Sequence, residues 1–196
     1  MLFYSADRWM ADPTLLLRIW EGGMSFHGGL LGVTAVIFLY SRANKIKFLS
    51  LADFVAPLVP AGLFFGRLGN FVNQELYGRA TDVPWAMIFP ADPLRLPRHP
   101  SQLYEAFLEG ILLFMIVHIF ARRPRSSGQV AGIFLVFYGF FRFLVEFVRQ
   151  PDAQFLNKQA LFPMFDWMTR GQLLCIPMIL LGLWFLRNLY STKAKE

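Results

Sequence analysis

Two arginine side chains stand inside apolar stretches of the chain. Arg67 follows VAPLVPAGLFF, and Arg142 lies within YGFFRFLVEFVRQPD. A charged side chain at the centre of a bilayer costs about 2.5–3.5 kcal/mol on insertion scales, so such residues usually pair with another charge or face a cavity. A guanidinium group is a planar fork that binds phosphate oxygens in pairs. The two arginines therefore indicate a site for an anionic, phosphate-bearing ligand.

The segment around Arg142 places its polar residues on one helical face. Tyr138, Arg142, Glu146 and Arg149 follow the spacing i, i+4, i+8 and i+11. At 100° per residue they fall within about 80° of one another. An internal ion-pair ladder that only ties helices together is the alternative interpretation. Two arginines around one glutamate leave surplus positive charge, and this surplus favours an anionic ligand.

The segment GRLGNFVNQELYGR repeats this pattern. If it is helical, Arg67, Asn70 and Gln74 share a face within about 60°. Three glycines lie at the start of this segment or just before it: Gly62, Gly66 and Gly69. Glycines let a neighbouring backbone or a ligand approach closely. Helix packing through the glycines, with Arg67 reaching outward to water, is the structural alternative.

Two further segments supply possible partners. SFHGGLLG places His27 before two glycines, where it could accept a proton near neutral pH. A hydrogen-bonded interface histidine is the equal alternative. RHPSQLYEAFLEG places Glu105 and Glu109 one helical turn apart, and we expect these acids to pair with Arg67 or Arg142.

Other catalytic patterns are missing from the sequence. It contains no HExxH motif or paired His/Asp cluster for a metal, no GxSxG elbow and no phosphate-cradling glycine loop. The single Cys175 lies in the apolar run LLCIPMILL and has no polar neighbours. We therefore expect no metal, no cofactor and no covalent enzyme intermediate. A direct displacement between two bound reactants fits better.

The elements that must position these residues are apolar helices. Of 196 residues, 56% are hydrophobic and 16% are charged, which indicates an all-α polytopic membrane protein with a single membrane domain. A span needs about 20 residues. Five segments qualify: 24–40, 51–69, 103–120, 130–148 and 172–190. Residues 1–23 read as an extracytoplasmic or interfacial segment, and residues 191–196 as a cytoplasmic tail.

The basic residues predict the orientation. Alternate loops and the tail carry nine of them: Arg42, Lys45, Lys47, Arg122, Arg123, Arg125, Arg187, Lys193 and Lys195. The positive-inside rule places these loops in the cytoplasm, so most of the charges within the spans fall toward the outer half. Topology and anionic lipid then explain the net charge of +6, and no nucleic-acid partner is required. A transporter or channel for an anionic solute is the non-enzymatic alternative. It predicts polar residues in both halves of the membrane, whereas the cytoplasmic halves are almost entirely apolar.

Four motifs together resemble the bacterial prolipoprotein diacylglyceryl transferases: FHGGLLG, GRLGNFVNQELYGR, RHPSQLYEAFLEG and YGFFRFLVEFVRQPDAQF. The resemblance covers essentially the whole chain from Met10 to Leu186. It implies transfer of the diacylglyceryl group of phosphatidylglycerol to the lipobox cysteine thiol of a preprolipoprotein, the first step of lipoprotein maturation. A thioether forms and glycerol 1-phosphate leaves. The implied location is the bacterial inner membrane, with the active site on the periplasmic side.

The resemblance also implies roles for individual residues. Arg67 would bind the phosphatidylglycerol headgroup, helped by Asn70, Glu75 and Gly78. His27 and Arg142 would be essential catalytic residues, and Tyr138 and Glu146 would join them from the helical face of Arg142. Arginines would stabilise the leaving phosphate, and the thiol needs a base or a positive field to become a thiolate. Two alternatives stay open for the thiol: His27 acts as the base, or Arg142 supplies the positive field.

The chain departs from the family in length. Family members usually carry two further spans ahead of the segment that matches Asp12–Gly23, which gives seven. We expect five spans here. The two spans that are missing would normally line the cavity in this family.

Overall fold

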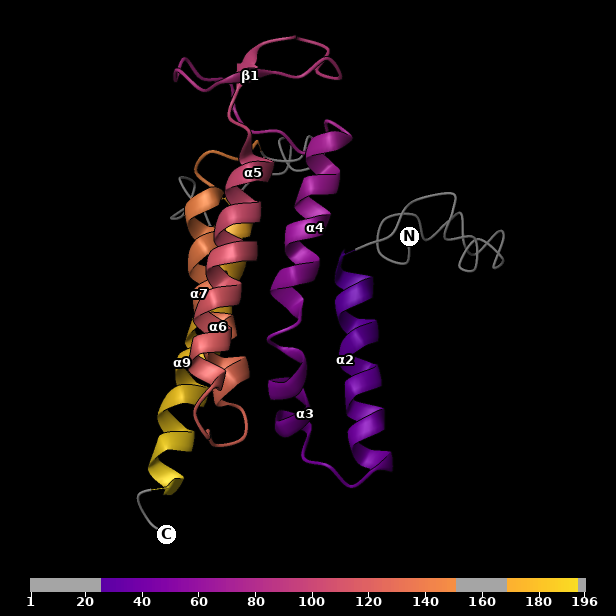
Figure 1. Ribbon diagram of the computed structural model, residues 1–196, viewed down its shortest axis with the longest axis vertical. Coiled ribbons are helices and arrows are strands. Elements are labelled where there is room, and N and C mark those ends of the chain that lie inside the picture. Colours follow the sequence, from indigo (N-terminus) through magenta and orange to yellow (C-terminus); the bar gives the residue numbers. More distant parts are fainter. Residues whose placement is uncertain (1–25, 151–168, 194–196) are drawn as a thin grey trace, which may run out of the picture. The chain divides into compact units, whose positions relative to one another are not determined.

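The structure, a computed structural model, describes residues 26–150 and 169–193 (Figure 1). The segment predicted to be interfacial, residues 1–23, lies outside the described residues, as do residues 151–168 and the end of the tail, residues 194–196. The chain divides into two compact units, residues 1–51 and residues 52–196, and each is described by itself.

The described part of the first unit is helix α2 (Phe26–Ala43), the turn that follows it and the first residues of helix α3 (Phe48–Val55). Asn44 N donates to the Tyr40 carbonyl and Ile46 N to the Ser41 carbonyl, which closes the helix. The ring of Phe38 meets Phe48 edge-on at 6.4 Å. Helix α2 carries large apolar side chains, among them Leu31, Val36 and Leu39.

The predicted apolar segment 51–69 is divided between two helices. Helix α3 (Phe48–Val55) and helix α4 (Val59–Val72) meet at a bend of 45°. Pro57 lies in the break and Pro60 in the first turn of α4. Proline has no amide hydrogen and disfavours helical geometry in the residue before it, so the helix cannot run through this point.

The next helix is continuous but changes its winding. Helix α5 (Ser101–Glu105) passes into a π-helical turn, η3 (Ala106–Leu112), and then into helix α6 (Leu113–Ala121). Helix α4 packs against α5 and η3. A Cβ atom on Gly110 would stand 2.7 Å from Cβ of Phe64, so this glycine is what lets α4 approach η3 closely.

Helix α7 (Gln129–Val145) packs along helix α9 (Arg170–Lys193), as Figure 1 shows in orange and yellow. The contact runs through small residues, since a Cβ atom on Gly182 would stand 2.7 Å from the Gly132 carbonyl oxygen. Asp53 of α3 caps the start of α7: its carboxylate accepts the amide hydrogens of Gly128 at 2.6 Å and Ala131 at 2.7 Å.

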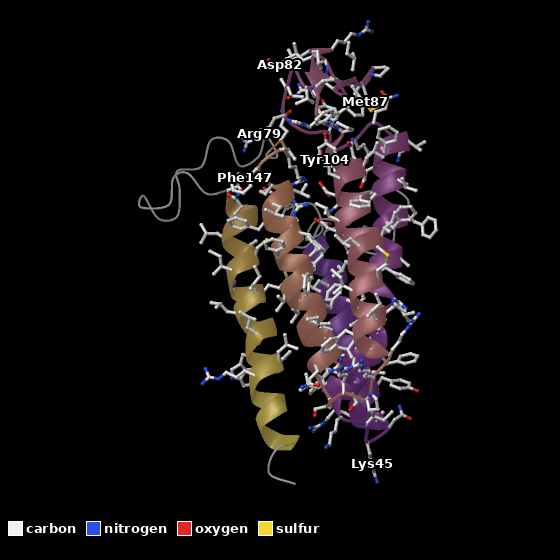
Figure 2. All side chains as sticks on the ribbon, turned by 60° about the vertical axis from the view of Figure 1, so that its left-hand side comes forward. Lys45, Arg79, Asp82, Met87, Tyr104 and Phe147 are labelled. Carbon is white, nitrogen blue, oxygen red and sulfur yellow. The ribbon has the colours of Figure 1, made fainter. Side chains whose placement is uncertain are left out.

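A loop over residues 73–100 joins α4 to α5. It contains a two-stranded antiparallel sheet in which β1 (Met87–Ile88) pairs with β2 (Pro97–Arg98). Figure 2 shows Asp82 and Met87 on this loop, beyond the end of the α5 helix that carries Tyr104. The indole Nε1 of Trp85 donates to the Tyr104 hydroxyl at 2.7 Å, which ties the loop to α5.

The helices of the second unit bury a small apolar core and expose large apolar side chains. The core includes Leu113, Val117 and Phe141, whereas Phe65, Val72 and Ile119 are each more than 60% exposed. Among the described residues, Ser101–Ala121 is long and apolar enough to cross a bilayer, and the bent α3–α4 pair passes the same test together. The mostly helical fold with membrane-capable helices is therefore confirmed, and the number of spans stays a prediction.

Candidate anion site

Three arginines and three glutamates form one cluster inside the second unit, which we call the Arg–Glu cluster: Arg67, Arg142, Arg149, Glu105, Glu109 and Glu146. Glu105 is its hub. Oε2 of Glu105 lies 2.6 Å from Nε of Arg67 and 3.3 Å from Nη1 of Arg142. Its Oε1 lies 3.8 Å from Nε of Arg149. One carboxylate therefore gathers guanidinium groups from α4, from α7 and from the segment after α7.

The other two acids complete the pairing. Glu109 lies 3.6 Å from Nη2 of Arg67 and 3.8 Å from Nη1 of Arg142. Glu146 accepts a hydrogen bond from Nη2 of Arg142 at 3.0 Å. Three acids thus face three arginines. The predicted surplus of positive charge on the α7 stripe is balanced by Glu105 and Glu109 from the neighbouring helix, which no spacing within α7 could reveal.

The two kinds of charge differ in depth. The side chains of Glu105, Glu109 and Glu146 are 1%, 0% and 5% exposed, whereas those of Arg67 and Arg142 are 19% and 15% exposed. Among the described residues, no donor reaches the Glu105 or Glu109 oxygens in hydrogen-bond geometry. Buried polar groups without aligned hydrogen bonds are uncommon, and a catalytic role is one reason for them. The accessible side of the cluster is lined by arginine, which suits an anion.

The start of α9 supports Glu146, a contact that the sequence reasoning missed. Thr169 and Gln172 form a reciprocal cap: Gln172 N donates to Thr169 Oγ1 at 3.2 Å, and Thr169 N donates to Gln172 Oε1 at 3.0 Å. Gly171 lies between them, and a Cβ atom there would stand 2.7 Å from the Glu146 carboxylate. The glycine lets this carboxylate rest against the positive end of a helix. The Thr-x-x-Gln spacing before an apolar run was the available signal.

Asn70 and Glu75, both predicted to assist headgroup binding, lie together at the end of α4. Asn70 Nδ2 approaches Glu75 Oε2 at 3.4 Å, and the Glu75 carbonyl accepts a hydrogen bond from Gln102 Nε2 at 2.7 Å. The flanking residues Gln74 and Leu76 have φ of 58° and 55°, a left-handed conformation that is uncommon for leucine. Strain of this kind in a turn often accompanies function.

Gln74 corrects one prediction. It was expected on the helical face of Arg67 and Asn70, but α4 ends at Val72 and the chain turns away. The Gln74 side chain instead accepts the amide hydrogen of Ala91 at 2.8 Å, within the 73–100 loop. A helical wheel holds only while the helix continues.

Gly78, the fourth predicted headgroup residue, lies where the 73–100 loop meets the segment after α7. It forms an antiparallel bridge with Arg149. A Cβ atom on Gly78 would stand 2.6 Å from the Val148 carbonyl oxygen and 2.8 Å from Cβ of His99. The structure therefore shows a close backbone approach at Gly78, and a role in substrate binding stays a prediction.

A buried ion pair holds the same loop in place, and the sequence reasoning missed it. Arg98 donates from Nε to Asp92 Oδ2 at 2.6 Å and from Nη2 to Oδ1 at 3.1 Å. Its guanidinium carbon lies 4.7 Å from the centre of the Tyr77 ring, and it also donates to the side chain of Gln150. Hydrogen bonds from Arg98 lower the pKa of the Asp92 carboxyl to about 2. The loop is thus fastened to the end of the segment that carries Arg149.

The remaining predicted residues are placed as follows. Tyr138 stacks on Phe134 with ring centres 5.6 Å apart and lies within electrostatic range of Glu109 and Arg142. His27 lies in the first turn of α2, and its side chain is outside the described part of the structure. Its predicted role as a base therefore stays a prediction.

Comparison with known proteins decides the family. Residues 1–187 match the family described as prolipoprotein diacylglyceryl transferase. The chain belongs to this family. It is 55% identical to the phosphatidylglycerol–prolipoprotein diacylglyceryl transferase of Azotobacter vinelandii over 195 residues, which is 100% of this chain and 72% of the relative.

Two other relatives carry the same name. The enzyme of Haemophilus influenzae strain PittEE is 54% identical over 194 residues, 99% of this chain and 69% of the relative. That of Pseudomonas putida strain W619 is 54% identical over 195 residues, 98% of this chain and 71% of the relative. The predicted diacylglyceryl transferase family is confirmed, and with it the transferase class.

Proposed function

We propose that this chain transfers the diacylglyceryl group of phosphatidylglycerol to the lipobox cysteine thiol of a prolipoprotein. The family and the names of its relatives support the reaction class. The structural observation that carries the proposal is the convergence of Arg67 and Arg142 on one carboxylate, Glu105, with both guanidinium groups on the accessible side. No comparable observation favours a transporter.

The reaction breaks one bond and forms another. The cysteine sulfur attacks the carbon of the diacylglyceryl group that is bonded to the phosphate oxygen. A C–S bond forms, and the C–O bond between that carbon and the phosphate breaks. The electron pair leaves with the phosphate of glycerol 1-phosphate. Negative charge grows on this phosphate in the transition state, and guanidinium groups held ready beside it stabilise that charge.

Each site residue has a proposed part. Arg67 binds the lipid phosphate, with Asn70 and Glu75 beside it at the end of α4. Arg142 provides positive field that favours the thiolate. His27 takes the thiol proton, which balances the reaction. Glu146 orients Arg142 by accepting its hydrogen bond, and we assign Tyr138 and Gly78 to the same site.

We also propose a membrane arrangement. The apolar helices form five spans of a multi-pass protein in the bacterial inner membrane, with the C-terminus in the cytoplasm. The Arg–Glu cluster then opens toward the periplasmic side. The basic loops over residues 42–47 and 122–125 support this orientation.

A reconstituted assay tests the function. The purified chain in phosphatidylglycerol vesicles, given a lipobox peptide, should yield a peptide that gains one diacylglyceryl group by mass spectrometry. A peptide with cysteine replaced by serine is the matched control and should gain nothing. Vesicles of phosphatidylcholine test the donor. An unchanged peptide with folded protein and phosphatidylglycerol present would refute the proposal.

A further inference from the structure

Glu105 and Glu109 lie behind the two arginines to which we assign the lipid phosphate and the thiol. We infer that these two glutamates are positioning residues: they hold Arg67 and Arg142 side by side so that the Arg67 guanidinium group faces the lipid phosphate while the Arg142 guanidinium group faces the thiol. The inference rests on the proposed function and adds to it two side chains that would act through the arginines.

The geometry of the helix supports this assignment. Glu105 ends α5 and Glu109 lies inside η3, so the pair sits at the start of a π-helical turn. Such turns are rare and occur often at functional sites. The close approach at Gly110 and Phe64 brings α4 against the same turn. Arg67 of α4 is thereby placed within reach of both acids.

Charge gives the physical reason. Arg67 and Arg142 both lie near Oε2 of Glu105, at 2.6 Å and 3.3 Å, so their guanidinium groups are close neighbours of like charge. Without an acid between them they would repel and separate. Burying two carboxylates is costly, and apolar side chains of similar size would often be at least as stable. Their presence fits a need to hold the arginines in one geometry.

The inference predicts that loss of one glutamate charge tightens anion binding while it slows the chemical step. Replacement of Glu105 by glutamine keeps the volume and removes the negative charge. The cluster then carries a net positive charge, so it should bind the anionic lipid and the released phosphate ester more tightly. The arginines lose their fixed orientation, so the chemical step should slow, because small misplacements of catalytic groups cost large factors in rate. A purely stabilising residue would not separate these two effects.

The experiment compares Glu105→Gln and Glu109→Gln with wild type and with Asp82→Asn. Asp82 is exposed on the 73–100 loop and belongs to none of the ion pairs of the cluster, so this control removes the same charge at a different place. We expect kcat to fall about 10- to 100-fold in each glutamate variant. The KM for phosphatidylglycerol should stay equal or fall, and glycerol 1-phosphate should inhibit at several-fold lower concentration. The control should match wild type in all three.

A second variant guards against a folding defect. Glu105→Asp keeps the charge with a shorter side chain, and it should recover part of the kcat that Glu105→Gln loses. Thermal unfolding in detergent should place the midpoints of all active variants close to wild type. A raised KM with unchanged kcat, or glutamine variants that behave like Asp82→Asn, would overturn the inference.

One measurement separates this inference from the proposed function. Calorimetry can measure the direct binding of glycerol 1-phosphate to the protein, and this measurement needs no catalytic turnover. A wild-type chain that transfers no lipid refutes the proposed function. In that case Glu105→Gln should still bind glycerol 1-phosphate several-fold more tightly than wild type, and equal or weaker binding refutes the positioning role.

Discussion

Nε of Arg67 lies 2.6 Å from Oε2 of Glu105, although the two residues lie far apart in the chain and on different helices. The same oxygen lies 3.3 Å from Nη1 of Arg142. A single buried carboxylate therefore joins two arginines that come from different helices. This relationship turns two isolated charges in apolar segments into one site.

Replacement of Arg67 by lysine should raise the KM for phosphatidylglycerol about tenfold or more. Lysine keeps the positive charge but loses the planar fork that binds two phosphate oxygens together. Initial rates across a series of phosphatidylglycerol fractions in mixed vesicles measure this effect. Arg95→Lys, an exposed position on the 73–100 loop, is the control. An unchanged KM for the Arg67 variant would remove its headgroup role.

Gly171→Ala should reduce turnover about tenfold with little loss of stability. The new Cβ atom would stand 2.7 Å from the Glu146 carboxylate, which must move and take its hydrogen bond to Arg142 with it. Alanine is a better helix former than glycine by about 1 kcal/mol, so the helix itself should not weaken. Gly62→Ala is the matched control, because a Cβ atom there meets nothing within 4 Å. Equal activity of both variants would show that the position of Glu146 does not matter.

Replacement of His27 by glutamine should strongly reduce kcat. If His27 takes the thiol proton, the wild-type rate should fall as pH drops below about 6.5, the ordinary pKa of histidine, because the protonated ring cannot act as a base. The variant should lose this acidic limb. His118→Gln is the control, since the His118 ring packs on Phe114 in α6. A glutamine variant with a normal rate and the same pH profile would leave His27 without a chemical role.

The 73–100 loop should loosen in acid. Folding lowers the pKa of Asp92 from 3.8 to about 2, so the folded protein binds this proton less readily than the unfolded chain. The stabilisation by the Asp92–Arg98 pair is therefore fully present above about pH 4 and is lost as the pH falls toward 2.

Amide hydrogen exchange can follow this change, because the amides of Leu94 and Leu96 donate to the Asp92 carboxylate. After correction for the intrinsic rate, their protection should fall between pH 4 and pH 2. In Asp92→Asn protection should already be low at neutral pH, whereas Asp82→Asn should resemble wild type. Protection in the Asp92 variant equal to that of wild type would show that another contact holds the loop.

The sequence was sufficient for relationships within one helix and for the family. Arg142 and Glu146 are four residues apart, and their hydrogen bond follows from helical periodicity alone. The motifs around His27, Arg67, Glu105 and Arg142 identified the transferase family, which the comparisons confirmed. The proline pair at residues 57 and 60 also carried the signal for the break between α3 and α4, although the apolar run was predicted as one span.

The tertiary structure decided what depends on register between elements. Hydrophobic periodicity fixes which face of a helix is buried, but it does not fix how far one helix slides along another or where a π-helical turn adds a residue. The contacts of Glu105 with Arg67 and Arg142 and the contact of Glu146 with Gly171 depend on such offsets. The Asp92–Arg98 pair depends instead on how the 73–100 loop folds back on itself. The sequence by itself therefore determined the family, the apolar segments and the charged residues of the Arg–Glu cluster, but not the break between α3 and α4. The packing of α4, η3 and α7 decided which charges from different elements meet, because the spacing of two elements along the chain carries no information on their distance in space.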